Sequence, residues 1–357
     1  MKISELLFKQ NNNFDLIRII LACLVIIGHS PVLNGLSGHW ADPIGYFFPF
    51  TYSGSLSVKA FFFISGLVVT NSYLSKQNGV YFVISRIFRI IPALLFLLLI
   101  TVFIFGPFLT TLSTIDYFSG LNSFSYIYNN LIFNTEYYLP GLFASNPYPH
   151  AVNGSLWSLK YEMGCYIFLL VTFLLLGRFN KYYLNIPIAF VIGDALLETP
   201  ILFAFLGINP DISLLPMSFA LGCLLAVNAD KLVINLYVLL IAGIFLFLCK
   251  GGPYAQIVLM ITFCSVITYI SSRKSVVKLR PRYDISYGIY LWGFLIQQTM
   301  VHYTGTIYVG LHCLIALLIS IALALVTNIF IEKPFIALGK KTFKSLKTKM
   351  PLLQSGI

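Results

Sequence analysis

Apolar runs of about twenty residues, separated by short polar segments, dominate the pattern of this sequence. A helix needs ~20 apolar residues to cross the hydrocarbon core of a bilayer. On that basis we predict an all-α, polytopic membrane bundle of about ten spanning helices. The predicted spans cover residues 15–34, 56–74, 86–105, 158–177, 183–205, 211–228, 232–249, 253–271, 283–303 and 308–331.

The composition changes the picture only by excluding a soluble protein. Of the 357 residues, 58% are hydrophobic and 10% are charged, whereas a soluble domain has about 25% charged residues. Too few polar residues remain to cover a water-exposed surface. We therefore expect one membrane domain over residues 1–335 and a short basic tail over 336–357.

The charged residues indicate an orientation for the bundle. The 23 Lys and Arg residues exceed the 12 Asp and Glu residues, giving a net charge of +11. Most of these cations fall in alternate connections between the predicted spans, as the positive-inside rule requires of cytoplasmic segments. We expect both termini to be cytoplasmic, and the charge itself does not call for a nucleic-acid partner.

The longest connection, residues 106–154, contains acidic residues but no Lys or Arg, so we predict that it is extracytoplasmic. It is rich in aromatic residues, which are Tyr117, Phe124, Tyr126, Tyr128, Tyr137, Tyr138 and Tyr148 among others. Two interpretations stay open. The aromatic side chains either form an interfacial belt or offer a platform on which sugar rings stack.

The first predicted span contains the strongest candidates for chemistry. Ionisable groups inside a bilayer are costly and are functional candidates by default. Arg18 and His29 are eleven residues apart, which places them on one helix face and ~16 Å apart along the axis. Asp15, at i,i+3 to Arg18, is expected to hold the guanidinium. His29 is either a packed interhelical histidine or a base that accepts a proton from a hydroxyl.

Two short motifs follow, each with two interpretations. Ser65-Gly66 in the second span either allows close helix packing or forms part of a site. Arg86 and Arg89, at i,i+3 near the start of the third span, either anchor the helix at the cytoplasmic boundary or bind anionic phosphate groups.

Glu162 lies about one turn inside the fourth span, at a depth similar to that of His29. The carboxylate would then orient the imidazole, as the third member of a catalytic triad does. The alternative is an ion pair with Lys59 or Lys160.

Two acidic residues in the fifth span suggest a different class of protein. Asp194 and Glu198 are at i,i+4, between Gly193 and Pro200, and resemble a proton relay in a broken helix. This pattern keeps a proton-coupled transporter or flippase as the alternative function. The sequence lacks GxSxG, HExxH, P-loop and GxGxxG motifs, which argues against a serine hydrolase, a zinc protease or a nucleotide enzyme of the usual kinds. No metal site is expected.

Six stretches in order along nearly the whole chain resemble the acyltransferase 3 family of bacterial membrane O-acyltransferases. They are FDLIRIILACLVIIGHS, FFFISG, RIFRIIP, NGSLWSLKYE, DISYGIYLW and IEKPF. The resemblance implies transfer of an acyl group, usually acetyl from acetyl-CoA, to a hydroxyl of a surface glycan or lipid-linked sugar. It also implies a multi-pass protein of the bacterial inner membrane, in contact with membrane lipid.

The resemblance assigns roles to particular residues. His29 would be the essential histidine with Arg18 as its partner, and Glu162 would complete the catalytic group. Substrate-binding roles would fall to Ser65, Gly66, Arg86, Arg89, Trp157 and Ser158.

This chain departs from the family pattern at two positions. Lys59 stands where the family often has an acidic residue, and Gly293 stands where a histidine often follows the Leu-Trp pair. The first departure removes a candidate acid, and the second removes a possible second histidine.

Together these features predict a route for the donor. The phosphates of acyl-CoA would bind Arg86, Arg89 and Arg18 on the cytoplasmic side, and the pantetheine arm would extend the ~16 Å to His29. Direct transfer and an acyl-histidine intermediate both stay open.

Overall fold

The computed structural model describes residues 1–36, 42–120, 122–177, 179–197 and 209–349. In these ranges the chain is helical and has no strand; Lys2 and Val233 form one isolated bridge. The all-α prediction is therefore confirmed for the described residues. Each predicted span has a helix at the expected place, although the segment 198–208 of the fifth lies outside the described residues.

The main helices follow one another in the order of the predicted spans. They are α2 (Phe14–Leu33), α4 (Ser53–Lys76), α5 (Gly79–Ile100), α9 (Leu159–Thr172), α10 (Asn185–Asp194), α11 (Pro210–Val227), α12 (Leu236–Cys249), α13 (Ala255–Ser271), α15 (Ser286–Thr304) and α16 (Val309–Thr327). Shorter helices are α1 (Ile3–Leu6), α3 (Pro43–Phe47), α6 (Gly106–Leu109), α7 (Thr114–Ser119), α8 (Asn122–Leu131), α14 (Lys274–Lys278) and α17 (Lys333–Lys349). The 3₁₀ turn Gly154–Ser158 leads into α9.

Five continuous helical segments of the described chain are long and apolar enough to cross a membrane. They are Phe14–Leu33, Ser53–Lys76, Gly79–Leu109, Gly154–Gly177 and Val309–Thr348. Three further apolar helices are shorter, namely Asp211–Val227, Leu236–Cys249 and Ala255–Ser271. Spans in the membrane are thus supported, whereas the number ten and the cytoplasmic position of the termini stay predictions.

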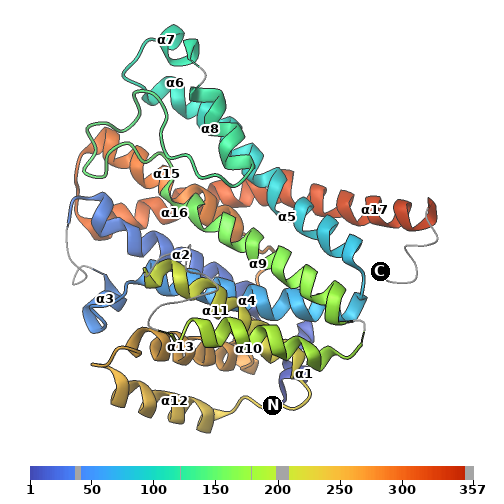
Figure 1. Cartoon of the computed structure of the whole chain (residues 1–357). Coiled ribbons are helices and arrows are strands. Elements are labelled where there is room, and N and C mark those ends of the chain that lie inside the picture. Colours follow the sequence, from blue (N-terminus) through green and yellow to red (C-terminus); the bar gives the residue numbers. More distant parts are fainter. Residues whose placement is uncertain (37–41, 121, 178, 198–208, 350–357) are drawn as a thin grey trace.

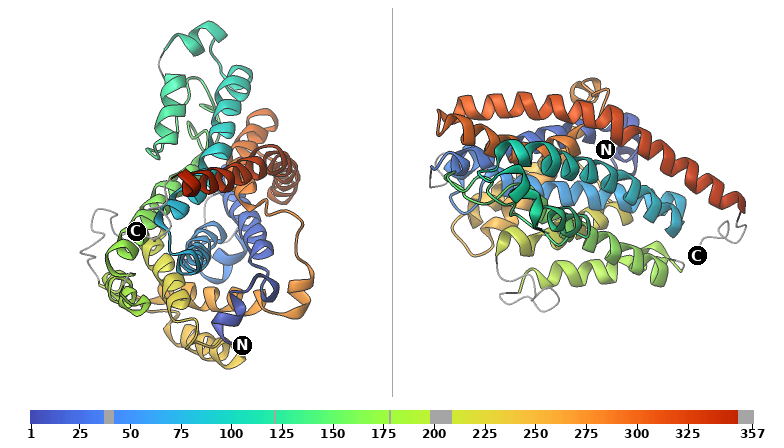
Figure 2. Two further views of the ribbon diagram at one scale, coloured as in Figure 1. Left: turned by 90° about the vertical axis from the view of Figure 1, so that its right-hand side faces the viewer. Right: turned by 90° about the horizontal axis from the view of Figure 1, so that it is seen from above.

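The long helices lie roughly alongside one another and run across the view in Figure 1. Helix α2 packs against α4 and α15, and α4 packs along α11. Helices α12 and α13 form the lower edge, and α6, α7 and α8 project at the top (Figures 1 and 2). Helices α2, α4, α5, α9 and α15 carry the candidate site.

Pairs of glycines allow the central helices to approach closely. A Cβ on Gly66 of α4 would lie 2.1 Å from the carbonyl oxygen of Phe219 on α11, and one on Gly222 of α11 would lie 2.1 Å from that of Phe63. Where α2 meets α4, a Cβ on Gly28 would lie 2.5 Å from the backbone nitrogen of Gly54. Small residues at such crossings are the usual means of close helix packing in membranes.

The C-terminal helix α17 continues α16 through one π-helical turn and extends beyond the body of the bundle (Figure 1). It packs against α5, where the rings of Phe343 and Tyr81 are 5.0 Å apart and Gly339 faces Phe88. The predicted basic tail therefore begins within this helix, and residues 350–357 lie outside the described residues.

Candidate active site

A cluster of arginines and carboxylates forms where α2 begins. The Asn13 side chain caps α2 by accepting a hydrogen bond from the Leu16 backbone N–H at 3.1 Å. This start places Asp15 and Arg18 one turn apart, and their Oδ1 and Nη2 atoms are 2.6 Å apart. The predicted pairing of Asp15 with Arg18 is confirmed.

Asp284 links two of the arginines. Its Oδ2 lies 2.9 Å from Nη2 of Arg18 and 2.7 Å from Nη2 of Arg89. The Ser286 hydroxyl and backbone N–H both donate to its Oδ1. Arg89 also lies 3.6 Å from the buried carboxylate of Glu332. Arg18 and Arg89 are therefore already matched by acidic partners within the protein.

Arg86 differs from these two arginines. Among the described residues it has no carboxylate within 4.0 Å, and its guanidinium lies 5.8 Å from the centre of the Tyr166 ring. Its Nε atom is buried without a hydrogen-bond partner. Of the three arginines, Arg86 has the guanidinium best able to accept a new anion.

The three arginines share one cavity of about 120 Å³, which we call the arginine cavity. It lies between α2, α4, α5, α9 and α15, and its polar lining residues are Arg18, Ser65, Arg86, Arg89, Ser158, Glu162, Tyr166, Ser286, Tyr287 and Tyr290. Five of the predicted substrate-binding and catalytic residues besides Arg18 thus meet here. Gly66 is instead pressed against α11, so the packing interpretation describes its position.

Glu162 belongs to a hydrogen-bonded chain in the arginine cavity. It accepts a hydrogen bond from the Tyr166 hydroxyl, which lies 2.8 Å from the hydroxyl of Ser65. Neither predicted lysine partner approaches it. The Nζ atom of Lys59 is 3.2 Å from Asp211, and that of Lys160 lies over the Tyr161 ring.

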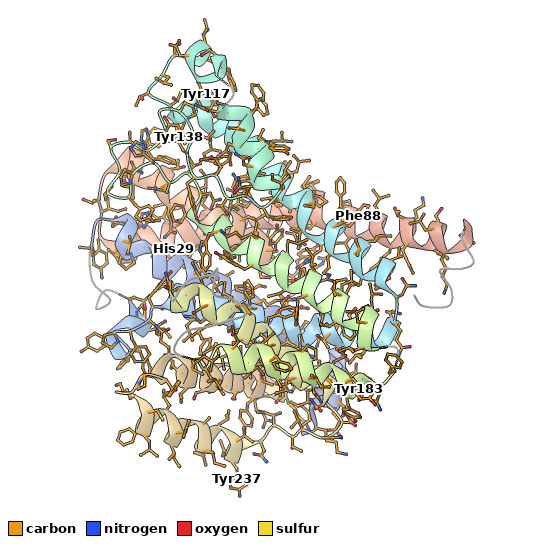
Figure 3. All side chains as sticks on the ribbon, viewed as in Figure 1. His29, Phe88, Tyr117, Tyr138, Tyr183 and Tyr237 are labelled. Carbon is orange, nitrogen blue, oxygen red and sulfur yellow. The ribbon has the colours of Figure 1, made fainter. Side chains whose placement is uncertain are left out.

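His29 lines a second, larger cavity of about 980 Å³, which we call the His29 cavity. Figure 3 shows His29 near one end of the bundle, beneath the loop that carries Tyr138. The imidazole meets the Phe294 ring edge to face at 5.3 Å, and its Nδ1 atom is buried without a hydrogen-bond partner. The close approach of Gly28 to Gly54 fixes the helix segment that carries it.

Aromatic side chains of the long connection surround the His29 cavity. Tyr137, Tyr138 and Tyr148 line it together with Trp157 and Tyr52. Burial, with the carboxylates of Asp211 and Asp42 nearby, raises the pKa of Tyr52, so its hydroxyl stays protonated and can donate.

Other aromatics of the long connection have different positions. Tyr117 and Tyr126 are fully buried in the core, whereas Phe124 and Tyr128 are exposed. The aromatic set therefore divides between core packing, surface and cavity lining.

The turn before α9 meets both cavities, since Trp157 lines the His29 cavity and the next residue, Ser158, lines the arginine cavity. We call this turn, together with the Tyr290 side chain bonded to it, the partition. The Tyr290 hydroxyl donates to the carbonyl oxygen of Ser155 and lies 2.7 Å from the hydroxyl of Ser158. Phe61 packs against the Tyr290 ring at 6.3 Å. Glu162 lines the arginine cavity and His29 lines the His29 cavity, and among the described residues no hydrogen bond joins this expected pair.

The other singled-out residues have structural partners. Asp194 is buried at the end of α10, and Glu198 lies outside the described residues, so the expected acidic face is not described. Lys59 is 2% exposed and is neutralised by Asp211 on the neighbouring helix. A Cβ on Gly293 would lie 2.6 Å from Cγ1 of Ile26, which explains why no side chain fits there.

Several residues of the site received no role from the sequence. Asp284, Tyr287 and Tyr290 stand in the stretch DISYGIYLW, and Glu332 stands in IEKPF. An acidic residue shortly after Arg280 and Arg282, at the start of a predicted span, was the available signal for Asp284. Nothing in the sequence could indicate that Tyr290 is bonded to the turn before α9.

The fold and site define a helical membrane protein in which a half-buried histidine and a cluster of arginines face separate cavities. The sequence model of the acyltransferase domain matches residues 11–330. The chain therefore belongs to the acyltransferase 3 family, and it is an acyltransferase.

Two curated relatives are similar to this chain. An O-acetyl transferase of Shigella phage Sf6 is 28% identical over 335 residues, which is 90% of this chain and 93% of the relative. Nodulation protein 10 of Rhizobium leguminosarum bv. viciae is 39% identical over 87 residues, which is 24% of this chain and 22% of the relative. No solved structure matches the chain.

Proposed function

We propose that this protein is an O-acetyltransferase that transfers an acetyl group from acetyl-CoA to a hydroxyl of a glycan. The observation that carries the proposal is the position of His29. Its ring lines a cavity large enough for a sugar, and its buried Nδ1 atom has no hydrogen-bond partner among the residues that the structure describes. The name of the Shigella phage relative supports acetyl as the transferred group.

The arginine cavity is proposed to bind the donor at the cytoplasmic side of a bacterial inner membrane. In the described part of the chain Arg86 has no carboxylate within 4.0 Å, so it would bind a phosphate of acetyl-CoA. Arg18 and Arg89 would hold the site in shape through Asp284. This proposal narrows the expectation that the phosphates bind Arg86, Arg89 and Arg18.

The partition between the cavities lies on the route that the pantetheine arm would take. Arg18 and His29 are eleven residues apart on α2, which corresponds to ~16 Å. In this proposal the acetyl thioester passes between Tyr290 and Ser158, whose hydroxyls are 2.7 Å apart, on its way to His29. Entry of the donor is therefore proposed to open this hydrogen bond.

In the His29 cavity the acceptor sugar is proposed to stack on Tyr137, Tyr138 or Tyr148. In the direct route His29 takes the proton of the sugar hydroxyl, whose oxygen attacks the thioester carbonyl. The C–S bond breaks, and the CoA thiolate leaves and recovers the proton. In the alternative route a nitrogen of His29 attacks the thioester carbonyl, the C–S bond breaks, and the CoA thiolate leaves with the proton of the imidazole. The sugar hydroxyl then attacks the acetyl-imidazole, and the released ring nitrogen takes the proton of the hydroxyl. A role for Glu162 in either route would require a rearrangement, since it lines the other cavity.

The test is acetyl transfer by a His29→Ala variant in membrane vesicles that receive acetyl-CoA on the arginine-cavity side. Glycans of cells that make the protein, and of cells that lack it, are compared by mass spectrometry. We expect the acetyl mass to appear with the unaltered protein and to be lost in His29→Ala. His302→Ala is the control, because His302 lies near Phe143 and outside the His29 cavity. Unchanged transfer by His29→Ala would overturn the assignment.

A further inference from the structure

An apolar groove of about 220 Å³ lies between α9, α10 and α11, apart from both cavities of the site. Its lining includes Leu169, Leu184, Ile188, Val191, Phe219 and Val227. Along α9 it extends from Lys160 to Thr172, which corresponds to ~18 Å of helix. A groove of this length and chemistry suits an extended hydrocarbon chain.

Gly164 keeps the middle of this groove open. It is exposed on α9, and a Cβ at this position would meet nothing within 4 Å. Gly66 and Gly28 differ from it, because neighbouring backbone leaves no room for a side chain at those positions. A glycine inside a helix is destabilising relative to alanine. Since no packing contact requires Gly164, its effect is to leave space in the groove.

One end of the groove carries a positive charge without an acidic partner. Lys160 is exposed, and its Nζ atom lies 4.9 Å from the centre of the Tyr161 ring. Among the described residues it has no carboxylate within 4.0 Å. A phosphate group would complement this ammonium, whereas a neutral lipid would not.

The Lys160 end of the groove adjoins the His29 cavity. Tyr161 lines the groove, and Trp157 lines the His29 cavity. Their rings are in edge-to-face contact with centroids 5.8 Å apart. A molecule with its chain in the groove and its phosphate at Lys160 would thus have its next chemical group beside the His29 cavity.

We propose that the groove between α9, α10 and α11 binds the hydrocarbon chain of a lipid-linked glycan, with Lys160 at its phosphate and the sugar at His29. The proposal rests on the proposed function and specifies its acceptor as a lipid-phosphate-linked sugar. The contact between Trp157 and Tyr161 favours a lipid that carries a sugar over a bulk phospholipid, because only the former uses both compartments.

The first test fills the groove with a Gly164→Phe substitution. The acceptors are the lipid-linked glycans extracted from the cells that naturally make the protein, and the same glycans after mild acid has released the lipid. Displacing about two buried methylene groups weakens chain binding about tenfold. We expect Gly164→Phe to raise the KM for the lipid-linked acceptor about tenfold and to leave transfer to the released glycan unchanged.

The matched control is Gly243→Phe on α12, where a Cβ also meets nothing within 4 Å. This variant introduces the same ring into another open helix surface, and we expect both acceptors to be used as before. If Gly164→Phe and Gly243→Phe have the same KM for the lipid-linked acceptor, the assignment of the groove as a lipid site is wrong while the proposed function stands. Failure of the unaltered protein with both acceptors would instead contradict the proposed function.

A binding measurement tests the groove independently of transfer. Native mass spectrometry of the purified protein with added polyprenyl phosphate should show a bound lipid, weakened about fivefold in Lys160→Gln and about tenfold in Gly164→Phe. The unaltered protein should bind neutral polyprenol about as weakly as Lys160→Gln binds polyprenyl phosphate. Equal displacement by phosphatidylglycerol would identify a general phospholipid site and overturn the proposal.

Discussion

The carboxylate of Asp284 lies 2.7 Å from the guanidinium of Arg89, at the point where α15 begins. The same oxygen lies 2.9 Å from Arg18, so one acid joins α2 and α5 to α15. Asp15 and Glu332 remain beside the two arginines when Asp284 is lost. The loss thus amounts to one charged contact at each arginine, and a charged hydrogen bond contributes about 1.5–3 kcal/mol. Asp284 therefore acts as a structural centre of the arginine cavity.

We predict that Asp284→Asn lowers the stability of the protein by about 3 kcal/mol, because each of two partly buried guanidinium groups loses a charged contact. Thermal unfolding in detergent measures the change. Asp230→Asn is the control, since Asp230 pairs with Lys181 at the surface and a surface ion pair contributes little. Equal unfolding temperatures for the two variants would contradict the role of Asp284.

Arg86 provides a second prediction. The Arg86→Gln variant should raise the KM for acetyl-CoA by about tenfold with a smaller change in kcat, because a charged hydrogen bond contributes about 1.5–3 kcal/mol. Steady-state kinetics with varied donor measures this. Arg273→Gln is the matched control, because the Arg273 guanidinium stacks over Tyr269 outside the arginine cavity. A KM that is the same in both variants would exclude Arg86 from donor binding.

The partition between the two cavities leads to a third prediction. Tyr290→Phe keeps the ring beside Phe61 but loses the hydrogen bonds to Ser155 and Ser158. Without these hydrogen bonds the partition is weaker, so water from the His29 cavity reaches the bound thioester more easily. We expect acetyl-CoA hydrolysis without acceptor to rise severalfold relative to transfer.

Free CoA release, followed with a thiol reagent, measures that hydrolysis. Tyr287→Phe is the comparison, since the Tyr287 hydroxyl bonds to the backbone of Ile90 rather than across the partition. The same hydrolysis rate in Tyr290→Phe as in the unaltered protein would show that these hydrogen bonds do not separate the compartments.

Much of the fold could be predicted from hydrophobic pattern, because each helix is defined by its own apolar residues. The pairing of Asp15 with Arg18 was equally accessible, since residues three apart on one helix face each other. The pattern also placed Ser65 and Glu162 in the membrane. It could not show that Tyr166 joins them, because that contact depends on how α4 and α9 cross.

The compartments of the site were not predictable in the same way. Helical periodicity places Arg18 and His29 on one face of α2, yet they line different cavities. The partition is formed by Tyr290 from α15 and by the turn before α9, which are distant in the sequence. Depth along the helix suggested that Glu162 could reach His29, but depth does not reveal what lies between two side chains.

The Ser65-Gly66 pair, for which packing and function were both open, allows a final prediction. Gly66→Ala would place a Cβ 2.1 Å from the carbonyl oxygen of Phe219, and such overpacking costs about 1–3 kcal/mol. Gly243→Ala meets no atom within 4 Å and should be neutral or slightly stabilising.

Ser65→Ala only removes a hydrogen bond to Tyr166 in the arginine cavity, so the stability of this variant should change by about 1 kcal/mol while its donor kinetics change more. Unfolding temperature and KM for acetyl-CoA, measured on all three variants, separate the two roles. A stable Gly66→Ala protein with impaired donor binding would show that Gly66 serves the site rather than the contact between α4 and α11.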